Sequence, residues 1–170
     1  MQIVVHTKFT LEEYRRLLRT YYSSLTAFKI GLIIGILFLS FAFVTLFEFG
    51  FGISKIGAVL PVLVMGLAST FASRLLAFYL AGKIYNGSKI HEKIIYRIDE
   101  KRFDVQGESF NSTTEWEKMY KVQELNEWFL VFPSKIYFNA LPKKDFQFGD
   151  IENFRDQLKG MSWLKLKLKG

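Results

Sequence analysis

Two long uncharged segments separated by a short loop constrain this chain more than any other feature. Ile30–Phe47 and Ile56–Ser73 each run for 18 residues without a charged side chain. Because a helix rises about 1.5 Å per residue, each would cover about 27 Å, close to the roughly 30 Å of bilayer hydrocarbon. Only Glu48–Lys55 connects them. The pattern predicts a transmembrane helical hairpin, since a soluble protein seldom contains two such segments in succession.

The charges that flank these segments predict which side of the membrane each end faces. Residues 1–29 carry five Lys or Arg against two acids, residues 74–170 carry 17 against 13, and the connecting loop is neutral. Lys and Arg beside a span mark its cytoplasmic end. We therefore expect a two-pass protein of the inner or plasma membrane with both termini in the cytoplasm. The modest net charge of +7 lies mostly beside the spans, which favours contact with anionic lipid over nucleic acid.

Several kinds of chemistry lack the residues that they need. The chain has no cysteine, which excludes disulfides and thiolate sites from it. His6 and His91 fit no metal-ligand spacing, and no phosphate-binding loop or nucleophile motif is found. The first 29 residues lack the apolar core of a cleavable signal peptide. We therefore expect a protein that is not an enzyme and has neither cofactor nor metal.

The segments on either side of the hairpin are patterned as a small α+β protein. Gln2–Phe9 is rich in β-branched residues and predicts a strand, and Thr10–Glu13 has the spacing of a capping box that begins a helix. We expect this helix to continue into the first span. From Ile90 the apolar period becomes two, with turns that predict about six short strands. A C-terminal amphipathic helix is indicated by the spacing of Ile151, Phe154, Leu158 and Met161.

These patterns divide the chain into three parts. Residues 1–29 contain the N-terminal strand and a juxtamembrane helix, residues 30–82 the hairpin, and residues 83–170 a cytoplasmic antiparallel β domain. We expect the β domain to be a small barrel or sandwich capped by the C-terminal helix, with Gln2–Phe9 available to join its sheet. The alternating Leu and Lys of Trp163–Gly170 leave three alternatives open: an edge strand, a frayed tail or a contact with anionic lipid.

Small residues recur at intervals of four in both spans. Ala27, Gly31 and Gly35 show this spacing in the first span, and Gly66 and Thr70 show it in the second. The spacing lets helix backbones approach closely. It predicts either contact between the hairpin's own helices or the face of a homo-oligomer.

Five residues are candidates for binding. Trp116 lies in a charged stretch and is either a packing residue or a contact for a partner, since tryptophan often anchors interfaces. Lys143 and Lys144 follow a strand and form either a solvated turn or a contact for lipid phosphate or a partner's carboxylate. Glu48 and Arg74 lie at the ends of the uncharged segments, where we expect them at the membrane interface.

Three short segments carry a family resemblance. They are Phe9–Tyr14 (FTLEEY), Glu115-Trp116 followed by Tyr120–Glu124 (YKVQE), and Asn139–Phe146 (NALPKKDF). In their order the chain resembles the YcxB-like family of bacterial membrane proteins. The resemblance implies two transmembrane helices followed by a C-terminal domain similar to the pleckstrin-homology superfold. It implies no defined activity and no set of functional residues.

Taken together, these features predict a membrane-anchored cytoplasmic interaction module. We expect it to bind a membrane-protein segment or a lipid headgroup, in an immunity or a regulatory role. The alternative is a subunit of a small oligomeric channel or transporter, with Glu48 facing a wet path. A membrane-embedded enzyme ranks last, because Ser and Thr are the only polar residue types within the two uncharged segments.

Overall fold

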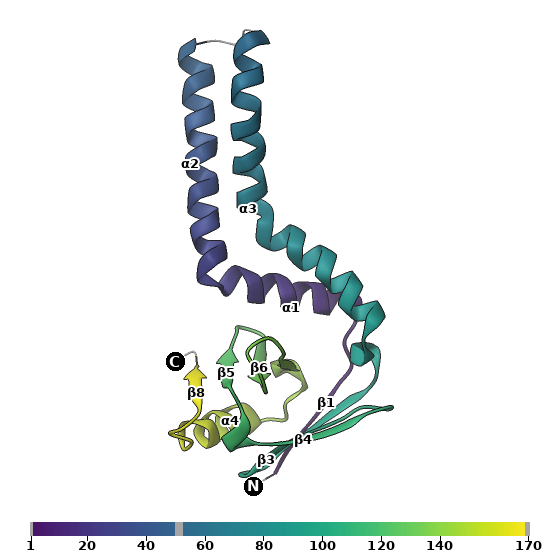
Figure 1. Ribbon diagram of the computed structural model, residues 1–170. Coiled ribbons are helices and arrows are strands. Elements are labelled where there is room, and N and C mark those ends of the chain that lie inside the picture. The colour runs from purple at the N-terminus through teal and green to yellow at the C-terminus, as the bar shows by residue number, and fades with distance from the viewer. Residues whose placement is uncertain (1, 50–52, 169–170) are drawn as a thin grey trace. The chain divides into compact units, whose positions relative to one another are not determined.

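The computed structural model describes residues 2–49 and 53–168 (Figure 1). The chain forms two compact units. One comprises residues 14–84 and is called the helical hairpin below. The other comprises residues 1–13 and 85–170 and is called the β domain. The β domain is therefore discontinuous in sequence, and the hairpin is inserted between its first strand and the rest.

Three helices form the hairpin: α1 (Leu11–Ser24), α2 (Thr26–Phe49) and α3 (Ile53–Gly87). The first residues of α1 and the last residues of α3 belong to the β domain. The predicted capping box is confirmed, because the Glu13 N–H donates to Thr10 Oγ1 at 3.2 Å and the Thr10 N–H donates to Glu13 Oε2 at 3.1 Å. The prediction of an uninterrupted helix into the first span is wrong, since the helix breaks at Leu25. Near this break, hydroxyl groups of successive Ser and Thr residues donate to carbonyls of the preceding turn, which bends helices.

The last helix is longer than predicted. The predicted hairpin boundary at residue 82 lies inside the helix, because α3 continues to Gly87. A glycine inside a helix costs only about 1 kcal/mol relative to alanine. The Tyr85 hydroxyl donates to the Phe9 carbonyl at 3.1 Å and fixes the end of α3 within the β domain. That contact favours continuing the helix past Gly82.

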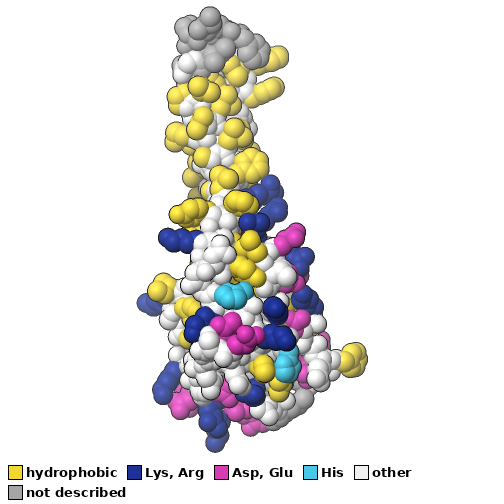
Figure 2. All heavy atoms as spheres, turned by 90° about the vertical axis from the view of Figure 1, so that its right-hand side faces the viewer, with side chains coloured by type: hydrophobic (Ala, Val, Ile, Leu, Met, Phe, Trp, Pro, Cys, Tyr) yellow, Lys and Arg dark blue, Asp and Glu magenta, His cyan; other side chains and the backbone are white. Residues whose placement is uncertain are grey.

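Two stretches of the hairpin are long and apolar enough to cross a membrane. They are Thr26–Glu48, with a mean hydropathy of 2.7, and Val59–Gly87, with 1.7. In each stretch only 11% of an 18-residue window is buried, whereas a core helix of a soluble protein would be mostly buried. Figure 2 shows hydrophobic side chains projecting along these helices. Phe43 and Phe47, for example, are 69% and 83% exposed. This exposure fits helices that face lipid.

The two long helices pack closely at Gly35 and Gly66. A Cβ atom at Gly35 would lie 2.8 Å from the Thr70 nitrogen and 2.9 Å from the Gly66 oxygen, and one at Gly66 would lie 3.1 Å from the Gly35 oxygen. Only glycine permits so close a backbone approach. The predicted contact between the hairpin's own helices is confirmed. The homo-oligomer stays a prediction.

The β domain contains two four-stranded sheets (Figure 1). The first has the order β1-β2-β3-β4 and is antiparallel throughout. Its strands are β1 (Ile3–Thr7), β2 (Ile94–Ile98), β3 (Arg102–Gln106) and β4 (Asn111–Glu115). The predicted N-terminal strand is confirmed, and it joins this sheet by pairing with β2 from Ile3↔Ile98 to Thr7↔Ile94.

The second sheet has the order β7-β6-β5-β8. Its strands are β5 (Lys121–Glu124), β6 (Trp128–Phe132), β7 (Asn139–Pro142) and β8 (Lys165–Lys167). The antiparallel β domain is thus confirmed in outline, but the described strands form two separate sheets and no closed barrel. Residues 134–137 form an exposed connection, and β7 begins at Asn139. Of the alternatives for the tail, Lys165–Lys167 form an edge strand parallel to β5.

The predicted C-terminal helix is confirmed as α4 (Asp150–Lys159), which completes the core between the sheets. Phe154 on this helix is fully buried, with its ring centroid 5.1 Å from that of Phe129 and 6.2 Å from that of Trp116. The first sheet contributes Phe103, whose ring lies 5.6 Å from Trp116. Aromatic pairs at such distances add to the stability that comes from burying their area. One core therefore joins both sheets to α4.

Candidate functional site

The predicted basic pair lies in η3 (Lys143–Asp145), the short 3-10 helix after β7. Lys143 Nζ donates to Glu124 Oε1 at 2.5 Å and lies 5.0 Å from the centre of the Phe129 ring. Its side chain is only 16% exposed, and that of Glu124 is fully buried. A buried carboxylate needs such a partner, because an unpaired charge away from water is very costly. Lys143 therefore serves as the partner of a buried carboxylate in this structure.

Glu124 has a second cationic partner in Arg155 of α4. Arg155 Nη2 and Nε donate to the Glu124 carboxylate at 2.6 and 3.3 Å. The hydrogen bond to Glu124 raises the pKa of the Arg155 guanidinium above its ordinary value. Sequence reasoning missed this cluster. The sequence offered one signal for the cluster: Glu124 lies between the apolar residues Val122 and Leu125. An acid buried at such a position needs a cationic partner.

The other residues of η3 contact the segment that leads from β1 into the hairpin. Lys144 Nζ forms an ion pair with Glu13 at the start of α1, and the Thr7 hydroxyl donates to Asp145. The hydrogen bond from Lys144 lowers the pKa of Glu13 below its ordinary value. The Tyr85 bond to Phe9 lies in the same unit. Together these contacts hold the segment before the hairpin and the segment after it to the β domain.

Trp116 packs inside the β domain. It is 1% exposed, and its indole N–H donates to the Asp99 carbonyl at 2.8 Å. This matches the packing alternative of the sequence analysis. A partner contact through Trp116 would have to be indirect, through the turn between β2 and β3 that its indole supports. That turn consists of Asp99, Glu100 and Lys101.

Glu48 and Arg74 belong to the hairpin. Glu48 is exposed in the last turn of α2, and Arg74 is exposed on α3 with its guanidinium 5.5 Å from the Phe71 ring centre. The residues of α3 from Ile53 to Ser73 would span about 31 Å at 1.5 Å per residue, close to the bilayer hydrocarbon thickness. Their membrane-interface role stays a prediction. The five predicted residues do not form one site.

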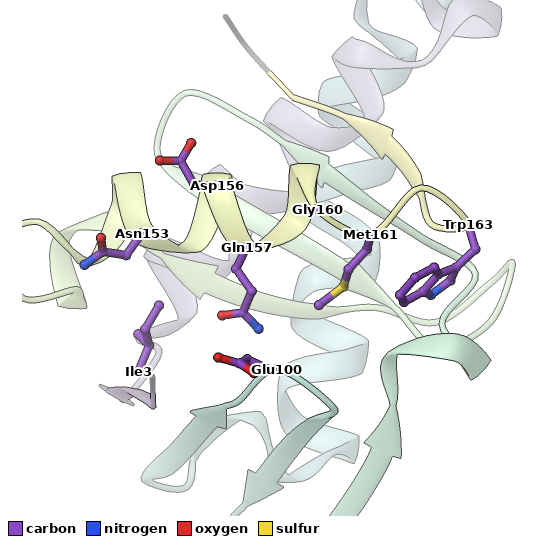
Figure 3. Close-up of a pocket in the computed structure, with 8 residues that line it drawn as sticks. All are labelled: Ile3, Glu100, Asn153, Asp156, Gln157, Gly160, Met161 and Trp163. Atoms are coloured by element: carbon purple, nitrogen blue, oxygen red, sulfur yellow. The ribbon is translucent and has the colours of Figure 1, made fainter.

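A pocket of about 430 Å³ lies beside α4, where sequence reasoning placed no site (Figure 3). Gln157 reaches from α4 toward the β2–β3 turn and donates to the Asp99 carbonyl at 2.5 Å. The same carbonyl accepts the Trp116 bond, so the helix, the turn and the core are connected at one atom. The lining residues are Ile3, Glu100, Asn153, Asp156, Gln157, Gly160, Met161 and Trp163.

The pocket combines carboxylates with an exposed aromatic ring. Trp163 is 58% exposed, and Glu100 and Asp156 supply two acids. Asp156 pairs with Lys159 at 3.3 Å, but both side chains are well exposed, so this pair contributes little to stability and exchanges readily. Glu100, Asp156 and Trp163 all belong to this lining, and carboxylates and aromatic rings are groups that bind guanidinium or ammonium cations. Of the lining residues, the sequence analysis named only Trp163, in the tail, and Met161, in the helix.

The turn beneath the pocket is rigidly held. Backbone N–H groups of Lys101 and Arg102 donate to Asp99 Oδ1 at 2.8 and 2.6 Å. Burial raises the pKa of Asp99, but these hydrogen bonds outweigh it and leave the pKa below its ordinary value. A second hollow of about 450 Å³ lies along the same turn and shares Glu100 with the pocket. In the described ranges 2–49 and 53–168 no three His, Cys, Asp or Glu residues are grouped to hold a metal ion.

Comparison with known protein families identifies a match within the β domain. Residues 98–158 match the family model described as YcxB-like protein. The match runs from the end of β2 into α4 and includes Trp116, Glu124, Lys143 and Arg155. No curated protein and no solved structure matches the chain. The chain therefore carries a YcxB-like domain at residues 98–158, preceded by two apolar helices that could cross a membrane.

Proposed function

We propose that this protein is a two-pass, membrane-anchored interaction module without enzymatic activity. Its helical hairpin crosses the cell membrane, and its β domain lies in the cytoplasm and binds a segment of another membrane protein. The pocket beside α4 is the proposed contact for that segment. A regulatory or immunity role fits such a module.

The pairing of β1 with β2 carries the proposal. These strands are paired in register over five residues, yet the whole hairpin lies between them in sequence. Strands of one sheet lie on one side of a bilayer, so an even number of crossings must separate them. Two apolar helices, α2 and α3, satisfy that requirement. The pairing thus supports a two-pass topology without any reference to charge.

Charge supports the cytoplasmic side. Residues 14–84 hold seven Lys or Arg against one acid, while the β domain holds 16 against 15. The excess of the hairpin lies mainly in Arg15, Arg16, Arg19, Lys29, Arg74 and Lys83, on the helix parts nearest the β domain in sequence. Lys and Arg at those positions favour a cytoplasmic β domain.

The enrichment of Lys and Arg at the cytoplasmic ends of membrane spans also indicates which chemical groups a partner would present. Cytoplasmic segments next to the spans of other membrane proteins are rich in Lys and Arg. The pocket offers Glu100, Asp156 and the exposed ring of Trp163, which suit such cations. Because the hairpin confines the β domain near the bilayer, a weak contact suffices for binding. The two sheets closed by α4 further support a relationship to the pleckstrin-homology superfold, as part of this proposal.

The test uses the full chain in native membranes. A photo-crosslinking amino acid replaces Asn153 at the pocket rim, and captured membrane proteins are compared between the wild type and a Glu100→Gln/Asp156→Asn variant. A Glu115→Gln/Glu117→Gln variant, which removes two exposed acids away from the pocket, is the matched control. We expect the first variant to lose the captured partners and the control to retain them. Identical capture by all three proteins would refute the pocket as the contact.

A further inference from the structure

Four lysines lie on β5, on β8 and in the connection that follows β6. β5 begins at Lys121, β6 ends at Phe132 and β8 begins at Lys165, and the register places Lys121 opposite both Phe132 and Lys165. Lys167 lies two residues along β8, and Lys135 lies three residues beyond Phe132 in the connection to β7. We call Lys121, Lys135, Lys165 and Lys167 the lysine surface.

No ion pair formed by the described part of the chain involves the lysine surface. Lys121 and Lys165 instead lie over aromatic rings, 4.2 Å from the centre of Phe132 and 5.4 Å from that of Tyr120. The predicted basic pair differs in this respect, because Lys143 and Lys144 are both neutralised within the β domain. The lysines available to an external anion are therefore not those that sequence reasoning selected.

The strands place three of these lysines on one face. Side chains alternate along a strand, so Lys165 and Lys167 point away from Leu166, which packs against the core. Lys121 is opposite Lys165 in the register and shares its face. Like charges directly opposite each other destabilise a sheet. Burial and the charge of Lys167 also lower the pKa of Lys121. A bound anion would relieve this repulsion.

Exposed apolar side chains border the lysine surface. Ile136 and Tyr137 directly follow Lys135 and are 95% and 56% exposed. Trp163, two residues before Lys165, is 58% exposed. Lysines next to exposed aromatic and aliphatic side chains suit the headgroup region of a membrane, where charge and partial apolar burial act together.

We infer that the lysine surface binds the anionic headgroups of the membrane that the hairpin crosses. The inference rests on the proposed membrane anchoring. That anchoring favours lipid over an acidic protein, because the chain holds the β domain near the bilayer through both Glu13 and Tyr85. Each lysine near an anionic surface favours the bound state by roughly fivefold. Three lysines together therefore shift the ratio of bound to unbound domain by roughly 100-fold.

The test uses the full chain in lipid nanodiscs of phosphatidylcholine alone or mixed with phosphatidylglycerol. The chain has no cysteine, so Ser134→Cys carries a single environment-sensitive fluorophore beside Lys135. Ser112→Cys on β4 is the control label. We expect the label at Ser134 to show a spectral shift in discs that contain phosphatidylglycerol and none in discs of phosphatidylcholine. The shift should disappear at 1 M salt, where the screening length falls to about 3 Å. The label at Ser112 should show no shift.

Variants then identify the lysines. Lys121→Gln/Lys165→Gln/Lys167→Gln should reduce the ratio of bound to unbound domain by about 100-fold, whereas the corresponding triple Arg variant should retain binding. Lys101→Gln/Lys118→Gln/Lys159→Gln removes the same charge elsewhere and should leave it unchanged. Equal responses of the two triple Gln variants, or no response to phosphatidylglycerol, would overturn the inference.

Two further results separate this inference from the proposed function. If the Ser134 label ignores anionic lipid but responds to an added polyglutamate peptide, the lysine surface binds an acidic protein and the inference fails. If lipid binding fails while capture at Asn153 persists, the interaction module stands without its lipid contact. If capture fails while lipid binding persists, the pocket proposal fails and the lysine surface stands.

Discussion

Replacing Gly35 by alanine should weaken the association of α2 and α3. The new Cβ would lie 2.8 Å from the Thr70 nitrogen and 2.9 Å from the Gly66 oxygen. Ordinary contacts begin near 3.4 Å, so the two overlaps are about 0.5 Å and both involve backbone atoms. A backbone atom cannot rotate away, so the helices must separate. Overpacking of this kind costs about 1–3 kcal/mol.

Gly31→Ala is the matched control. Its Cβ would lie 3.9 Å from the Ser69 oxygen, an ordinary contact. Both substitutions gain the same helix propensity, about 1 kcal/mol by comparison with soluble helices. The difference between the two variants therefore isolates the steric term, and we expect Gly35→Ala to be less stable by about 1–3 kcal/mol.

The assay follows helix separation in mixed micelles as the fraction of denaturing detergent rises. Donor and acceptor fluorophores on Thr26→Cys and Leu75→Cys report the distance between α2 and α3, since the chain has no other cysteine. Equal stability of the Gly35 and Gly31 variants would refute the close packing at Gly35. A further decrease on Gly35→Val would strengthen the steric explanation, because the valine side chain adds volume at the same contact.

Three further measurements test the β domain and the alternative function. Glu124→Gln should lower the free energy of unfolding by about 2–4 kcal/mol, since it removes charge-assisted bonds from Lys143 and Arg155. Tryptophan fluorescence during denaturation measures the change in stability. An unchanged denaturation midpoint would contradict the prediction. Wild type should be more stable than Lys144→Gln above pH 4.5, the ordinary pKa of Glu13. This difference should disappear as the pH falls through the lowered pKa of Glu13 in the folded protein. A difference independent of pH would show that the ion pair contributes nothing. Proteoliposomes of the wild type should show no ion flux, whereas flux that Glu48→Gln abolishes would support the channel alternative instead.

The sequence patterns that depend on local physics predicted the fold well. The uncharged segments, the capping box at Thr10–Glu13 and the period of α4 each reflect neighbours in sequence, and each is confirmed. The break at Leu25 has a local cause in the Ser and Thr hydroxyl bonds before it, whereas two other errors arose where distant contacts decide. α3 passes Gly82 because Tyr85 bonds to Phe9, and the strands form two sheets because long-range pairing is not encoded in any single segment.

The binding residues were harder to predict for the same reason. Lys143 and Lys144 form a conspicuous pair in sequence, but their acids come from Glu124 and Glu13, far away in the chain. The lysine surface assembles from β5, β8 and a connecting segment, so its charge is visible only once the strands pair. The pocket beside α4 likewise draws on residues from Ile3 to Trp163.

The placement of β1 ahead of the hairpin has a consequence for biogenesis. During translation β1 is synthesised before both apolar helices, and its partner β2 is synthesised after them. In the proposed two-pass topology, insertion of only one helix would leave β1 and β2 on opposite faces of the bilayer. The edge of β2 is then bare and its chain is open to aggregation or proteolysis. In that topology, completion of the first sheet would show that both helices have inserted.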